Sequence, residues 1–318
     1  MRRLLDEFAQ VGRLDSEGTF TVDLSKAQDK LQMYRLESPS SYLLSLVAAA
    51  NSSGARHLWI NQGPDGILVC HDGEIVSTEE LQDLFSRISA GAAASKTYLT
   101  ELGIAIQGAR ALSPERLVFE SGDRDSGTLF ILNGEDARIL NIKELPPRQG
   151  VHVSATNRFY LHYQRPSIFQ RLLGQSNGGS EEPMLRRFAL FSPCRLFWNN
   201  VPMPVPPLGG WDICERLDGE SRMAKIELVG NRRLTTDNAG SFSGYLGFGK
   251  TKGVWLIIND GVRYQVEIPS TAAPNSRAIV FTGGLKKDLS GQKLIDDIHY
   301  QNLISAIKAG LDSLRSRA

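Results

Sequence analysis

The chain has 318 residues, of which 41% are hydrophobic and 22% are charged, a composition typical of a globular protein with two domains. Its formal net charge is +1, so the charge of the whole chain does not indicate a nucleic-acid partner. No uncharged apolar run approaches the roughly 20 residues that a membrane-spanning helix needs, so we expect no membrane partner.

The three cysteines, Cys70, Cys194 and Cys214, are odd in number and lie far apart. This pattern predicts free thiols in a reducing compartment, because disulfide frameworks and zinc sites use closely spaced or even sets. The histidines are not at ligand spacing either, so we expect no metal site. Asp6 and Glu7 interrupt the apolar start, which therefore does not resemble a signal peptide. We expect a cytoplasmic protein.

The first half alternates between predicted helices and strands. Segment 39–55 has apolar residues at helical spacing, which predicts a buried amphipathic helix between Pro39 and Gly54. Two alternating runs flank the turn sequence Gly-Pro-Asp-Gly at residues 63–66 and predict a hairpin. Further elements are predicted as a helix over 1–10, a strand and helix within 18–36, helices over 78–88 and 99–112, and strands over 116–121, 128–133, 138–142 and 151–155.

A polar, glycine-rich stretch at residues 173–183 predicts a domain boundary, giving domains 1–175 and 184–318. In the second domain, Asn-Asp-Gly at residues 259–261 is a strong hairpin signal. Other predicted elements are strands over 188–191, 195–198, 224–229, 254–258, 263–268 and 278–281, and one or two helices within 289–314.

Segment 39–55 reads PSSYLLSLVAAANSSGA. It is similar to the first helix of the GHKL (Bergerat-fold) ATPases, which include MutL, gyrase B and HtpG-type chaperones. MutL-like proteins read P-x-S-x-x-x-E-L-V-x-N-x-x-D-A-G-A here. The chain keeps the length and several packing positions, but the family's catalytic glutamate falls on Ser45, its magnesium-binding asparagine on Ala49 and its aspartate on Ser52.

Segment 71–81, HDGEIVSTEEL, resembles the family's second motif, D-x-G-x-G followed by E-E-L at a helix start. Gly73 matches the first glycine, and the adenine-binding aspartate falls on His71. Asp72 could take that role if the frame slips by one residue. By this resemblance, His71 could accept one hydrogen bond from adenine, but only in the right tautomer.

Segment 102–111 resembles the third motif, G-x-G-x-x-S-A, with Gly103 on the first glycine and Gly108 in place of the serine. Segment 150–172 is similar to the run that closes the ATPase domain in MutL-like proteins. The resemblance implies an α/β sandwich of Bergerat type, with helices on one face of a mixed sheet, followed by a transducer-like α/β domain.

Ser45, Ala49 and Ser52 share one helix face, which by this resemblance would line the nucleotide pocket with small, uncharged groups. A serine hydroxyl cannot act as a general base near neutral pH, and a methyl group offers no oxygen to magnesium. We therefore predict that magnesium-dependent ATP hydrolysis is absent or very slow, while ATP remains a possible ligand. If the chain is an enzyme, it is an ATPase.

Residues 244–251, GYLGFGKT, also satisfy the P-loop pattern. A working P-loop joins a buried strand to a helix, whereas the sequence here is polar upstream and strand-like downstream. A glycine-rich loop before a strand is the favoured interpretation, and a P-loop NTPase is the alternative. By the resemblance, Lys250 or Lys252 could be the lysine that transducer domains send to the γ-phosphate.

The motif resemblance and the P-loop pattern together indicate three possible functions. The leading one is a GHKL-like binding or assembly module with a degenerate nucleotide site, acting as a homodimer or beside a protein partner. The others are an ATP-driven chaperone-like or MutL-like switch, and the P-loop NTPase.

Overall fold

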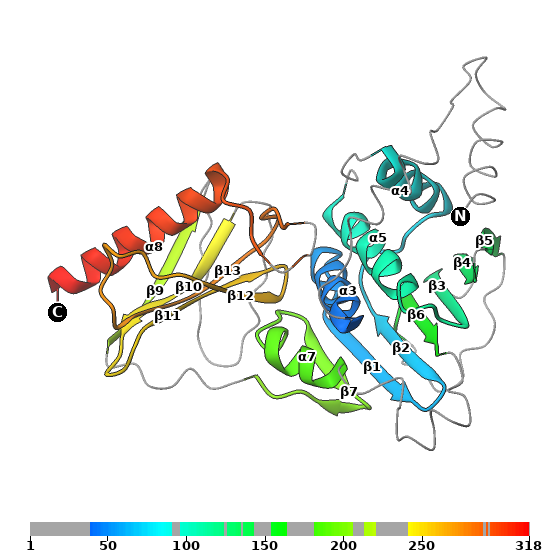
Figure 1. Cartoon of the computed structure of the whole chain (residues 1–318), viewed down its shortest axis with the longest axis horizontal. Coiled ribbons are helices and arrows are strands. Elements are labelled where there is room, and N and C mark those ends of the chain that lie inside the picture. Colours follow the sequence, from blue (N-terminus) through cyan, green and yellow to red (C-terminus); the bar gives the residue numbers. More distant parts are fainter. Residues whose placement is uncertain are drawn as a thin grey trace, which may run out of the picture. The chain divides into compact units, whose positions relative to one another are not determined.

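The computed structural model describes residues 39–90, 96–123, 126–134, 136–142, 154–163, 181–205, 213–220, 241–288, 291 and 293–317. The chain forms two compact units (Figure 1), Met1–Leu185 with Arg195–Met203, and Arg186–Cys194 with Pro204–Ala318. The elements predicted within residues 1–36 and 224–229 lie outside the described residues. Within the described ranges, no helix is both long and apolar enough to cross a membrane.

The helix predicted from segment 39–55 is confirmed. A 3-10 turn, η1 (Pro39–Ser41), leads into α3 (Tyr42–Ser52), and eight of its eleven residues are buried. Gly54 follows the helix with φ +74°, a left-handed conformation that glycine adopts at little cost. Helix α3 packs against α5 (Thr97–Arg110).

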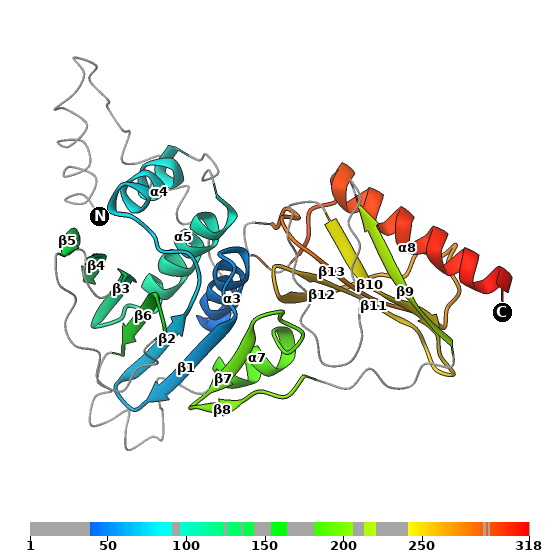
Figure 2. The ribbon, with the colours of Figure 1, turned by 180° about the vertical axis from the view of Figure 1, so that it is seen from behind.

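The first unit contains a mixed eight-stranded sheet in the order β5-β4-β3-β6-β2-β1-β7-β8. Neighbouring strands are antiparallel except for β1 and β7. Helices α3, α4 (Thr78–Ala90) and α5 lie on one face of this sheet (Figures 1 and 2). The strands are β1 (His57–Gly63), β2 (Gly66–His71), β3 (Arg116–Gly122), β4 (Gly127–Asn133), β5 (Asp136–Ile142), β6 (Asn157–His162), β7 (Arg195–Trp198) and β8 (Val201–Pro202).

Of the strand expected over 151–155, residues 151–153 lie outside the described residues, and residues 154–155 are not in a strand. The next strand, β6, begins at Asn157. One prediction in this region is wrong. The strand expected over 188–191 is the end of helix α7 (Glu181–Phe188) and the turn after it. Acidic residues in the first turn and basic residues in the last turn favour this short helix.

The start of α7 is held to the first sheet by a buried carboxylate. Glu181 accepts hydrogen bonds from the Tyr163 hydroxyl (3.1 Å) and from the Gln62 amide of β1 (3.4 Å). Fourteen residues after Glu181, β7 begins and pairs with β1. The strands β7 and β8 therefore belong to the first sheet, although they lie beyond residue 175 in the chain.

The second unit contains a five-stranded sheet in the order β12-β11-β13-β10-β9, in which β11 and β13 are parallel. The turn at Asp260 and Gly261 has positive φ at both residues, so the predicted hairpin is confirmed. The elements are β9 (Ile213–Glu220), β10 (Ser241–Phe248), β11 (Val254–Asn259), β12 (Val262–Val266), β13 (Ser276–Thr282) and α8 (Ile298–Arg317).

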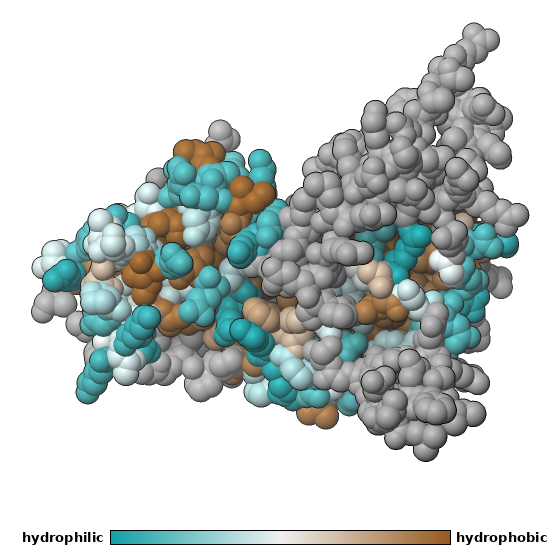
Figure 3. Space-filling view, in the orientation of Figure 1, coloured by the Kyte–Doolittle hydropathy of each residue, from teal (hydrophilic) through white to brown (hydrophobic). Residues whose placement is uncertain are grey.

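One face of this second sheet is covered by α8 (Figure 2). Leu303, Ile307 and Leu311 of the helix pack against Trp255 and Val280 of the sheet. At the N-terminal end of α8, Ile295 and Ile298 are 43% and 63% exposed, and Figure 3 shows hydrophobic surface there among hydrophilic residues. Both units are thus α/β layers, so the predicted fold class is confirmed.

Candidate functional site

Helix α3 presents no acidic side chain, because none occurs between Tyr42 and Ser52. Ser45 and Ala49 are buried, at 8% and 4% exposed. The Ser52 hydroxyl donates to the Ala48 carbonyl at 2.6 Å, so it is turned back onto its own helix. The face that the resemblance assigns to the catalytic groups therefore carries the hydroxyl of Ser45, the methyl of Ala49 and the hydroxyl of Ser52, which is bonded to a carbonyl of the same helix.

The amide of Asn51 is also turned back onto α3, a feature that the sequence does not reveal. Its nitrogen donates to the Val47 carbonyl at 2.8 Å. This hydrogen bond holds the amide nitrogen against the carbonyl of the preceding turn of α3.

Both carboxylate oxygens of Asp72, the residue that a frame slip would assign to adenine, are engaged by the start of β1 and the residue before it. Its Oδ1 accepts the backbone N–H groups of Arg56 (2.7 Å) and His57 (2.8 Å), and its Oδ2 pairs with Nδ1 of His57 at 2.8 Å. Partial burial acts to raise the pKa of Asp72, but the hydrogen bonds from His57 and Arg56 lower it below its usual value. Both oxygens thus fix the entry into β1.

His71 is neutral and has a defined tautomer. Burial lowers its pKa to about 4, although the charge of Asp72 acts in the opposite direction. Its Nδ1 accepts the N–H of Gly73 at 3.3 Å, so the proton of the neutral ring is on Nε2. In this tautomer the second ring nitrogen can only donate, whereas an aspartate at this position would only accept.

Packing is sufficient to explain Gly73. A Cβ atom here would lie 2.1 Å from Oγ of Ser53 and 2.9 Å from Nδ1 of His71. The backbone N–H of Glu74 donates to the Ser53 carbonyl at 2.9 Å, which keeps the two segments in contact. The retained glycine is therefore explained without a bound phosphate or base.

The segment after β2 is held by polar residues that the motif analysis missed. Thr156 Oγ1 donates to the Gly73 carbonyl at 2.5 Å. Asn157, fully buried, donates to the Glu74 carbonyl at 2.8 Å and accepts from the Ser121 hydroxyl at 2.7 Å. That hydroxyl in turn accepts the N–H of Val76 at 2.7 Å.

A sequence signal for this network exists. Asn157 lies on the same face of β6 as Phe159 and Leu161, and Ser121 lies on the same face of β3 as Phe119. A polar residue at a core-facing position of an otherwise apolar strand indicates a buried polar network.

The helix after this segment begins with a reciprocal cap. The Ser77 hydroxyl accepts the N–H of Glu80 at 3.1 Å, and the Glu80 carboxylate accepts the N–H of Ser77 at 3.0 Å. Lys96, just before α5, pairs with both Glu74 and Glu80 and contacts the Tyr98 hydroxyl. These hydrogen bonds raise the pKa of Lys96. This cluster joins the segment after β2 to the starts of α4 and α5.

Gly103 and Gly108 lie inside α5 and are buried. Helix α5 is continuous from Thr97 to Arg110, so the backbone N–H groups of both glycines are used within the helix. The structure therefore places them inside a helix that packs on α3, rather than in a glycine-rich loop.

The P-loop interpretation is wrong. Residues 244–248 belong to β10, and Gly244 pairs with Val280 on one side and Leu217 on the other. Their backbone groups are used in the sheet, and Thr251 is followed by β11 instead of a helix. Lys250 lies in the exposed turn between β10 and β11, in the second unit.

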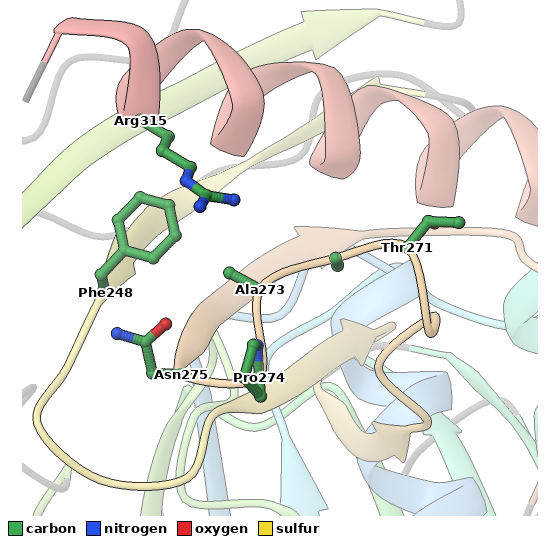
Figure 4. A pocket seen from close by; sticks show the side chains of 7 residues that line it. Phe248, Thr271, Ala273, Pro274, Asn275 and Arg315 are labelled. Atoms are coloured by element: carbon green, nitrogen blue, oxygen red, sulfur yellow. The ribbon is translucent and has the colours of Figure 1, made fainter.

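A cavity of about 510 Å³ lies in the second unit (Figure 4). It is open at the surface, and Figure 4 shows the Arg315 side chain extending from α8 toward Phe248. Its walls are Phe248, residues 271–275 and Arg315. None of the residues assigned to a nucleotide by the resemblance lines it.

No protein-family model matches the sequence, and no curated protein matches it. Among solved structures, the chain is similar to the B-subunit of the DNA gyrase from Myxococcus xanthus, at a TM-score of 0.48 and 10% sequence identity. The similarity covers 86% of this chain and 89% of that chain.

Proposed function

We propose that the chain is a GHKL-fold protein whose nucleotide site does not hydrolyse ATP, and that it acts as a binding or assembly module. The observation that carries this proposal is the composition of α3, which has no carboxylate and buries Ser45 and Ala49 at the catalytic positions. A neutral hydroxyl is a poor general base, and the loss of such a base costs about 10²–10⁴ in rate.

The surroundings of α3 support the same proposal. Asp72, the nearest carboxylate in sequence to the second motif's aspartate position, is bound to His57 and to two backbone N–H groups. His71 is neutral and presents a donor. An adenine amino group needs an acceptor at that position, so a weaker affinity for adenine follows.

The proposal includes a second copy of the chain or another protein as partner. The exposed Ile295 and Ile298 at the start of α8 offer a small apolar contact for one. The buried free thiols of Cys70 and Cys194 suit a reducing compartment such as the cytoplasm.

The magnesium dependence of ATP binding tests the proposal. Calorimetric titrations of the full chain with ATP are made with magnesium and with the metal chelated. No binding, or the same affinity in both conditions, supports a site that lacks metal ligands. Binding that tightens tenfold or more with magnesium contradicts it and favours the ATP-driven switch.

A further inference from the structure

The ring of Phe188 in the second unit is contacted by two guanidinium groups. The Cζ atom of Arg187 lies 5.0 Å from the ring centroid, and that of Arg263 lies 5.9 Å from it. Arg187 is in the last turn of α7, whereas Arg263 is on β12. Two positive charges from separate elements are therefore held against one aromatic side chain.

These two charges have no acidic partner among the residues that the structure describes. The Nε atom of Arg263 is buried and has no hydrogen-bond acceptor there. Arg158 in the first unit also has a buried Nε without a hydrogen-bond acceptor, but its guanidinium pairs with the carboxylate of Glu120 at 2.8 Å. A buried donor without an acceptor is unfavourable, and an added acceptor restores the lost hydrogen bond.

Burial and the neighbouring positive charge both act against the charged form of Arg263. Burial lowers the pKa of Arg263, and the neighbouring charge of Arg187 lowers it further. Both effects disfavour the charged form of a side chain that nevertheless stays charged at neutral pH. An anion placed beside the pair would offset this repulsion and would accept charge-assisted hydrogen bonds from both guanidinium groups.

Helix electrostatics explain only half of the arrangement. A cation in the last turn of α7 interacts favourably with the negative end of the helix, which accounts for Arg187. It does not account for Arg263, which is opposite Ile258 in the register of the sheet and reaches Phe188 from there.

We propose that Arg187 and Arg263, which both contact the ring of Phe188, form an anion site that binds a phosphate group. Planar guanidinium groups match the oxygens of phosphate with two parallel hydrogen bonds each. The two Cζ atoms are at most about 11 Å apart, and a diphosphate, which has two phosphoryl groups, spans such a separation more readily than a single phosphate does. This proposal is independent of the nucleotide site proposed above.

Inorganic phosphate and pyrophosphate are the probes, with chloride at matched ionic strength as the reference. Binding to the full chain is measured by calorimetry and by the shift of the thermal unfolding midpoint. Wild type should bind, and R187Q and R263Q should each bind at least about tenfold more weakly, the equivalent of one charge-assisted interaction. R195Q is the matched control, because Arg195 lies 5.3 Å from the Phe197 ring as a single cation, and it should bind as wild type does.

A second readout does not depend on ligand. Arg263 is on a strand and has no helix end to stabilise, so R263Q only removes one of two like charges, and its unfolding midpoint without phosphate should equal or exceed that of wild type. The proposal is overturned if wild type shows no binding beyond the chloride reference, or if R187Q and R263Q bind as tightly as R195Q. A folded R187Q that loses only the phosphate-dependent shift supports it.

Discussion

Replacing Gly73 with alanine tests whether packing, rather than a ligand, fixes the glycine of the second motif. The new Cβ would lie 2.1 Å from Oγ of Ser53, a separation at which one of the two segments must move. Ser53 is buried and its hydroxyl donates to the Ala50 carbonyl at 3.0 Å, so it is not free to swing away. Overpacking of this kind costs about 1–3 kcal/mol of unfolding free energy.

Urea unfolding of the unliganded chain measures that cost, with two further variants as controls. Gly63→Ala adds a methyl where the nearest atom is 4.0 Å away, and should change stability by less than about 0.5 kcal/mol. In a Ser53→Ala background the closest contact is gone, so Gly73→Ala should cost less there by about 1 kcal/mol or more. A Gly73→Ala variant as stable as wild type, or no coupling with Ser53, would refute the packing explanation.

The remaining predictions concern charge and protonation. His71 has a folded pKa of about 4, below its unfolded value of about 6.5, so its contribution is complete above pH 6.5 and is lost as pH falls toward 4. Between pH 7 and pH 4.5, the free energy of unfolding, measured with urea, should fall by up to about 3 kcal/mol more for wild type than for His71→Gln. Equal losses in the two proteins would contradict a neutral His71 ring. Asp72→Asn should lower stability by about 1–3 kcal/mol at pH 7, because the charged acceptor for His57 and two backbone N–H groups is weakened. Glu79→Gln, which removes a carboxylate from the first turn of α4 and leaves the Asp72 contacts intact, is the control. An equal effect of both substitutions would argue against the role of Asp72.

The elements that the sequence predicts well are those set by local patterns. Helix α3 follows from apolar spacing and a terminal glycine, and the hairpins β1–β2 and β11–β12 follow from their turn residues. Strands β9 and β10 were not predicted, because glycine and charged residues interrupt their apolar pattern. Their pairing with each other and with β13 is a tertiary property.

The candidate site shows the same division. The positions of Ser45, Ala49 and Gly73 could be assigned from the motif frame, but the partners of Gly73 could not. Thr156 and Asn157 reach it from a segment more than 80 residues away, and that contact depends on the register of β6 with β2. The P-loop pattern misleads because it is a local match. It does not show that residues 244–248 form a strand between two others.

The rate of phosphate release from ATP, with magnesium present, tests the central claim most directly. Enzymes commonly turn over about 10 times per second, so the loss of a general base alone predicts a rate of roughly 0.001–0.1 per second or less. The account predicts that wild type stays within or below this range and that Ser45→Ala has the same rate. A faster steady rate that Ser45→Ala removes would show that Ser45 supports catalysis and would contradict the account.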